Sequence, residues 1–153
     1  MVNDLATQAQ TQTPNHTDVA NRLRPALLKV ARELRRESHA LGVRAGHVTL
    51  LIQIHKHRGI GVNDLAALER VSPAAMSGHI ARLEAAGLVR RTPHASDRRR
   101  QGLSVTEEGE RVLRSVKSRR TAWLAARLKR LDPDEVETLD AAVEPLLALL
   151  EDE

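Results

Sequence analysis

Three consecutive arginines are the most distinctive candidates for chemistry in this 153-residue sequence. Arg98, Arg99 and Arg100 follow Asp97 within the segment 92–102. A guanidinium is planar and always charged, and its paired N–H donors suit phosphate groups and the edges of bases. A run of charges can also be no more than a solvated loop, so the surrounding elements must decide between these two interpretations.

A second candidate lies at Ser72, where a helix is predicted to begin. Serine is a favoured N-cap and Pro73 suits the first helical position, so the free N–H groups and the helix dipole at this end favour a phosphate. The apolar residues Met76, Ile80 and Leu83 share one face of this helix. The other candidate contact residues of the helix are Ala74, Ala75, Ser77, Gly78, His79 and Arg82.

Arg82 has two open interpretations. It can contact a phosphate, or it can pair with Glu84 or Asp97 and only brace the fold. The small residues around it permit close approach of a partner.

The sequence contains no convincing metal or catalytic site. His55 and His57 are two positions apart, so on a helix they point about 200° away from each other and cannot easily share an ion. Glu107 and Glu108 stand at a predicted helix start, where they stabilise the dipole. No nucleophile elbow or glycine-rich phosphate loop is present. We therefore expect neither an enzyme nor a bound cofactor or metal.

Composition narrows the class of protein further. The chain has no cysteine, which excludes disulfides and thiol chemistry, and only 1% of its residues are aromatic, which disfavours base stacking on exposed rings. Residues 1–130 hold 24 Lys and Arg against 11 Asp and Glu, whereas residues 131–153 hold nine acids and no base. The sequence shows no signal peptide or membrane span, so we expect a cytoplasmic protein with a basic body and an acidic tail.

Periodicity predicts a mainly α fold with a small β-hairpin wing. A polar arm, expected to be disordered, precedes a long helix that begins near Thr17 or, because of Pro25, at Arg24. The further helices are expected at 48–55, 62–69, 72–86, 106–129 and 134–150, the last with a kink at Pro145. Short strands at 88–91 and 103–105 bracket the arginine cluster, and Trp123 lies on an apolar stripe suited to core or dimer packing.

The order helix, turn, helix, hairpin and helix over residues 61–109 is that of a winged helix-turn-helix. Its motifs resemble those of the MarR-type (multiple-antibiotic-resistance regulator) transcription factors. They include Val71-Ser72-Pro73, Gly87-Leu88-Val89, Asp97-Arg98-Arg99 and Thr106-Glu107-Glu108-Gly109. The resemblance extends in layout over about residues 20–150.

The resemblance implies four regions. They are a disordered arm at 1–16, dimerisation and scaffold helices at 17–57, a winged helix-turn-helix DNA-binding domain at 58–109, and C-terminal dimerisation helices at 110–153. Residues 72–82 would be the recognition helix, with Ser77 as a contact residue. Asp97 and Arg99 would be the wing pair, in which Asp97 holds an arginine side chain ready for the minor groove.

Two positions depart from the family pattern. Glu69-Arg70 stands where many members carry Leu-Gly, and Gly78 stands where a longer polar or basic side chain is common. The second departure leaves fewer side chains for direct base readout. Ala74, Ala75, His79 and the backbone would then contribute more to sequence recognition.

The resulting functional prediction is a homodimeric regulator of transcription, and most simply a repressor, that binds a pseudo-palindromic site in double-stranded DNA. The resemblance also implies release by a small, often aromatic or phenolic effector bound between the dimer helices and the winged domain. One alternative is a winged-helix protein-interaction module without specific DNA readout. Another is a histidine-based, metal-responsive DNA binder.

Overall fold

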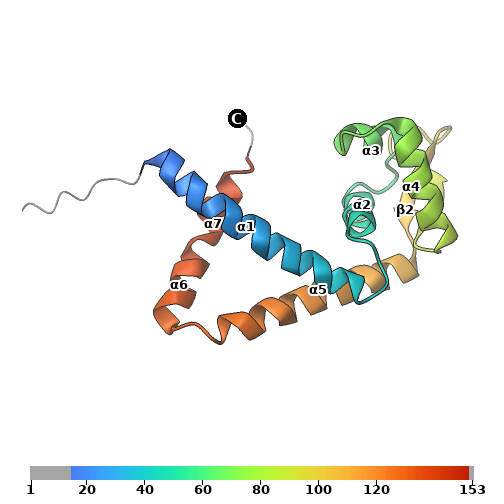
Figure 1. Ribbon diagram of the computed structural model, residues 1–153. Helices are drawn as coiled ribbons and strands as arrows, with labels where there is room; N and C mark the ends of the chain where they lie inside the picture. The colour runs from blue at the N-terminus through green and yellow to red at the C-terminus, as the bar shows by residue number, and fades with distance from the viewer. Residues whose placement is uncertain (1–14, 152–153) are drawn as a thin grey trace, which may run out of the picture. The chain divides into compact units, whose positions relative to one another are not determined.

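The computed structural model describes residues 15–151 (Figure 1). Helix α1 (His16–His39) begins at His16, because the Asn15 side chain accepts a hydrogen bond from the Thr17 backbone N–H at 2.9 Å. The helix continues through Pro25, so the alternative start at Arg24 is wrong. Of the disordered arm expected at 1–16, residues 1–14 lie outside the described residues. The other two are ordered, since Asn15 caps the helix and His16 is its first residue. The chain divides into two units after Glu33.

Three shorter helices follow in the second unit. They are α2 (Ala45–Lys56), α3 (Val62–Leu68) and α4 (Pro73–Ala85). Helix α2 starts three residues before the expected position 48, and Gly46 lies in its first turn. Gly87, with φ of 71°, ends α4 as expected, since glycine adopts this left-handed conformation without steric cost.

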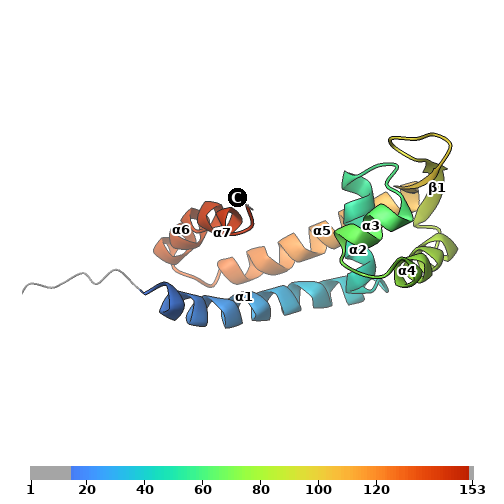
Figure 2. The same ribbon diagram turned by 90° about the horizontal axis from the view of Figure 1, so that it is seen from above.

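The strands β1 (Val89–Pro93) and β2 (Gln101–Val105) form one antiparallel hairpin. Its register pairs Val89 with Val105 and Pro93 with Gln101, so residues 94–100 form the connecting loop. Figures 1 and 2 both show α3, α4 and the hairpin grouped beside the start of α5. This arrangement is the expected winged helix-turn-helix.

Helix α5 (Glu107–Leu128) begins after Thr106, whose hydroxyl accepts a hydrogen bond from the Gly109 N–H at 3.1 Å. A side chain at position 109 would collide with the Leu88 carbonyl, which explains the glycine at this helix start. Further along α5, Arg120 donates to the Ser38 hydroxyl at 2.7 Å and to the Leu34 carbonyl at 3.1 Å. These bonds attach the last turns of α1 to the middle of α5.

The expected single C-terminal helix is instead two helices, α6 (Pro133–Ala141) and α7 (Val143–Ala148). The break lies at Ala142 rather than at Pro145. Proline has no N–H, and its ring crowds the carbonyl four residues earlier, which here belongs to Ala141. The helix therefore ends ahead of the proline and does not kink at it.

The hydrophobic core lies within the winged-helix part of the second unit. Its fully buried side chains come from α2, α3, α4 and β2, and they include Leu51, Ile54, Leu65, Ile80, Leu83 and Leu103. Helix α2, which the sequence grouped with the N-terminal scaffold, thus supplies two of the best-buried residues. This core fixes the positions of α4 and of the hairpin.

Candidate nucleic-acid interface

The start of α4 has the capped geometry that the sequence predicts. The Ser72 hydroxyl accepts a hydrogen bond from the Ala75 N–H at 3.1 Å, and Pro73 occupies the first helical position. Met76, Ile80 and Leu83 are buried against the core. The exposed residues of the same helix are Pro73, Ala74, Ala75, Ser77, Ala81, Arg82 and Ala85. Small side chains on the outer face let another molecule approach the helix backbone closely.

His79 lies at the edge of this outer face, next to Arg82 and turned about 200° away from Ser77. Its ring is edge-on to the ring of His47 from α2, with 6.2 Å between the centroids. The Nδ1 atom of His79 is buried and has no hydrogen-bond partner among the described residues. The structure therefore does not bring His79 together with Ser77, and its part in base readout remains a prediction.

A cavity of about 360 Å³ lies beside these two histidines. Besides both imidazoles, its lining includes the Arg44 and Arg82 side chains and a single acid, Glu69. Burial, together with electrostatic interactions with His79, Arg44 and Arg82, lowers the pKa of His47 below 6.5. The cavity thus combines an apolar floor that includes Met76 with an electropositive wall.

The predicted brace to Glu84 exists, but Arg82 does not make it. Arg91 on β1 donates two hydrogen bonds to the Glu84 carboxylate, at 2.9 and 3.1 Å. Arg82 is exposed and forms no ion pair within residues 15–151. Its guanidinium is therefore available for a phosphate.

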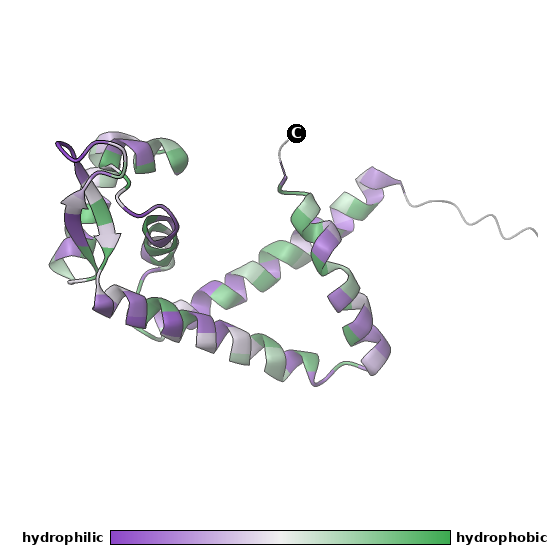
Figure 3. Ribbon diagram, turned by 180° about the vertical axis from the view of Figure 1, so that it is seen from behind, coloured by the Kyte–Doolittle hydropathy of each residue, from purple (hydrophilic) through white to green (hydrophobic). Residues whose placement is uncertain are grey.

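Asp97 orders the backbone of the loop at residues 94–100, which we call the wing loop. Its carboxylate accepts a hydrogen bond from the Arg99 backbone N–H at 3.0 Å, and its carbonyl accepts one from the Arg100 N–H at 3.0 Å. The expectation that Asp97 holds an arginine side chain is corrected, because the bonds close a turn instead. Arg98, Arg99 and Arg100 are exposed, and Figure 3 shows the loop as strongly hydrophilic.

The base of the wing is joined to the segment between α2 and α3. Gly59 donates its N–H to the Leu103 carbonyl at 2.8 Å and accepts the Ala95 N–H at 2.9 Å. A side chain at Gly102 would collide with the Gly59 carbonyl, and one at Gly59 would lie 2.8 Å from the Ala95 nitrogen. Glycine at both positions therefore lets the two backbones touch.

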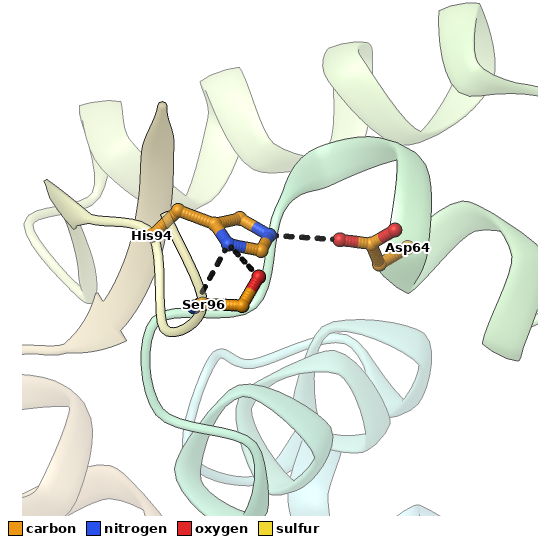
Figure 4. A network of polar contacts seen from close by, with 3 residues as sticks. All are labelled: Asp64, His94 and Ser96. Atoms are coloured by element: carbon orange, nitrogen blue, oxygen red, sulfur yellow. Dashed lines mark hydrogen bonds and ion pairs between the residues drawn. The ribbon is translucent and has the colours of Figure 1, made fainter. Parts of the chain in front are cut away.

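The sequence pattern does not single out His94, whose role becomes visible only in the structure. Its ring is 7% exposed and lies between Asp64 of α3 and Ser96 of the wing loop (Figure 4). Asp64 is 30 residues away in the chain, so no local spacing signals this contact. The two histidines considered as a metal pair do not meet: His55 contacts Glu110 at 2.7 Å, and residues 15–151 contain no metal-binding cluster.

Comparison with known proteins agrees with this geometry. The model of the MarR family matches residues 44–100, from the start of α2 through the wing. An HTH-type transcriptional regulator of Mycobacterium bovis is 31% identical over 134 residues, which cover 88% of this chain and 94% of that protein. The chain belongs to the MarR family of transcriptional regulators.

Two further proteins resemble this one over most of the chain. The transcriptional repressor MdtR of Bacillus subtilis is 29% identical, with 78% of this chain and 77% of that protein covered. The crystal structure of a Pseudomonas aeruginosa protein described as a transcriptional regulator superposes with a TM-score of 0.80 at 30% identity. It covers 92% of this chain and all of that one. MarR proteins are DNA-binding regulators and not enzymes.

One departure from the MarR pattern has a visible structural consequence. Arg70, in place of the usual glycine, has φ of 54°, which is left-handed backbone. For a non-glycine residue this conformation costs roughly 1 kcal/mol or more, so the helix-turn-helix here tolerates some strain at its turn.

None of the helices within residues 15–151 combines the length and the apolar character that a membrane span needs.

Proposed function

We propose that this MarR-family regulator is a homodimeric repressor that binds a pseudo-palindromic operator. In each protomer α4 enters the major groove, and the wing loop places Arg98–Arg100 against the adjacent backbone and minor groove. The observation that carries this proposal is that one buried core supports both a capped helix with an exposed small-residue face and an exposed arginine loop. Two such units related by a two-fold axis fit half-sites about 10 bp apart.

Exposed apolar side chains on the terminal helices support the dimer. Leu27 of α1 is 44% exposed, and Leu139 of α6 and Leu147 of α7 are 49% and 52% exposed. The helices α6 and α7 contain no buried residue at all, and Figure 3 shows hydrophobic bands along both. Covering these side chains with a second copy removes apolar surface from water, which is the main driving force of association.

The cavity beside α4 supports release by a small effector. It lies between α2, the turn before α4, and α4 itself, so an occupant there contacts the helix proposed to read DNA. Two guanidiniums against one carboxylate favour an anionic molecule, and the apolar lining, which includes Met76, suits an aromatic or phenolic ring. A ligand that binds better to a form unable to span both half-sites would release the operator.

Fluorescence anisotropy with labelled duplexes tests the DNA-binding proposal. The parent protein is titrated with the DNA upstream of its own gene and with a scrambled duplex, across a salt series. We expect selective binding with a steep salt dependence. Benzoate added to the complex tests the effector, and we expect it to release the operator.

Variants locate the contacts in the same assay. Arg99→Ala is expected to weaken binding to both duplexes and to lower the salt slope by about one, whereas Arg130→Ala removes the same charge outside the interface and serves as the control. Ser77→Ala is expected to change the preference between sites by about 1 to 3 kcal/mol. Binding of the parent without preference for either duplex would instead favour the protein-interaction module.

A further inference from the structure

A buried histidine connects the helix-turn-helix to the wing loop. The Nε2 atom of His94 is 2.9 Å from Oδ2 of Asp64 on α3. On the other side of the ring, Nδ1 is 3.2 Å from the Ser96 backbone nitrogen and 3.1 Å from the Ser96 hydroxyl (Figure 4). One ring thus spans two parts of the fold that are not neighbours in sequence.

The partners of His94 define its tautomer. A backbone N–H can only donate, so Nδ1 must accept from Ser96 and cannot carry a hydrogen. The hydrogen therefore lies on Nε2, which donates it to the Asp64 carboxylate. This hydrogen bond is the largest cause that lowers the pKa of Asp64, and the positive charge of Arg100 adds to it. The carboxylate is 53% exposed, whereas the imidazole is buried.

The backbone around the ring leaves space for it. A Cβ at Gly61 would lie 3.0 Å from Oδ2 of Asp64 and 3.1 to 3.2 Å from the His94 ring. The backbone of His94 also closes the wing loop, since its N–H donates to the Arg100 carbonyl at 2.9 Å. His94 therefore holds the loop twice, through its backbone at the loop ends and through its side chain to α3.

We propose that His94 is a positioning residue for DNA binding: its neutral ring couples α3 to the wing loop and so keeps Arg98–Arg100 in register with α4. Helix α3 packs directly on α4, so the hydrogen bond from His94 to Asp64 fixes the position of the wing loop relative to the recognition helix. The inference rests on the proposed function, in which the wing arginines contact DNA.

The physical effect of the link is pre-organisation. A loop held by the ring has fewer conformations to lose when its arginines bind phosphates, and this lowers the entropy cost of binding. Without the link the arginines keep their charge but reach DNA from a broader set of positions. We expect the His94→Ala variant to bind the operator roughly three- to tenfold more weakly at unchanged overall fold.

Three substitutions separate the two sides of the ring. His94→Gln keeps an amide N–H that can reach Asp64, His94→Asn keeps an acceptor near the Ser96 N–H, and His94→Ala keeps neither. We expect Gln to restore most of the operator affinity and Asn to restore little, because the bond to α3 is the one that positions the loop. His39→Ala, which removes an exposed histidine at the end of α1, is the control.

Two measurements on the free protein test the hydrogen bonds of His94 in the absence of DNA. Long-range ¹H–¹⁵N NMR correlations are expected to show His94 as the Nε2–H tautomer in the parent protein. Amide exchange at Ser96 and Ala95 is expected to accelerate in His94→Ala and to stay near the parent rate in the control. Circular dichroism confirms that each variant retains its helices.

A combined variant decides between positioning and general stability. In a background with Arg98, Arg99 and Arg100 all changed to alanine, adding His94→Ala should cost no further affinity, because there is no charged tip left to position. An equal further loss in that background, or an Nδ1–H tautomer in the parent, would overturn the proposal.

Failure of the proposed function has a different signature. If the triple-arginine variant binds DNA like the parent, the wing contact itself is wrong, even where the tautomer and exchange results agree with the link. If the triple variant is weakened and His94→Ala is not, the wing contact is right and the role of His94 is wrong.

Discussion

The winged-helix part of the chain and the helices α6 and α7 bury their apolar side chains to very different degrees. Leu51, Leu65 and Leu83 have no exposed surface, whereas Leu139 and Leu147 leave about half of theirs in water. Both regions contain regular helices, and each has one with a capped start, α4 and α6, so the difference does not lie in secondary structure. It shows that a single chain completes the packing of its winged-helix part, residues 45–105, which we call the reading head. The same chain leaves apolar side chains of its C-terminal helices exposed.

The difference matters for function because the stability of the two regions depends differently on protein concentration. Packing within one chain does not depend on protein concentration, whereas packing between copies does. A reading head that is complete in one chain can keep its geometry while the association of two heads varies. For the proposed homodimer on a pseudo-palindromic operator, the spacing of the two heads would decide whether both half-sites are engaged.

The largest effect is expected from a cavity in the reading head. Leu83→Ala removes a fully buried side chain of α4, and we expect the free energy of unfolding to fall by about 2 to 5 kcal/mol. Urea denaturation measures the loss. Leu68→Ala, at a side chain 47% exposed at the end of α3, should lose clearly less. Equal losses for the two variants would show that the core described here does not dominate stability.

A smaller effect, on association alone, is expected from the C-terminal helices. Introducing both Leu139→Glu and Leu147→Glu places charges on the apolar side of α6 and α7, and we expect the dimer dissociation constant to rise about tenfold or more. Sedimentation over a concentration series measures it. Ala67→Glu, an exposed position on α3, adds a charge to the reading head and should leave the constant unchanged. A double variant that remains as dimeric as the parent would remove α6 and α7 from the interface.

Local signals in the sequence predicted much of this fold. The cap at Ser72, the cap at Thr106 and the left-handed end at Gly87 each depend on residues within a few positions, so composition and spacing are sufficient to find them. The family motifs cover the same segments. The fold class, the element order and the exposed arginine loop can therefore be predicted from the sequence alone.

The partners of charged side chains were not accessible in this way. Glu84 pairs with Arg91 and not with Arg82, because the path of β1 after Gly87 brings Arg91 beside α4. The link from Asp64 to His94 depends on how the wing folds back onto α3. Tertiary structure selects these partners, and sequence distance does not, since Glu84 is closer in sequence to Arg82 than to Arg91.

The smallest effect is expected at the cavity beside α4, where the buried Nδ1 atom of His79 has no hydrogen-bond partner among the described residues. Burial and electrostatic interactions with His79, Arg44 and Arg82 lower the pKa of His47, so between this lowered value and 6.5 the unfolded chain binds a proton that the folded chain does not. This group therefore contributes stability at pH 7 that declines as the pH falls through that window. His47→Gln should flatten the fall in melting temperature between pH 7 and pH 5, whereas the exposed control His39→Gln should follow the parent profile. Parallel profiles for all three proteins would mean that the imidazole at position 47 is as free to take up a proton in the folded head as in water.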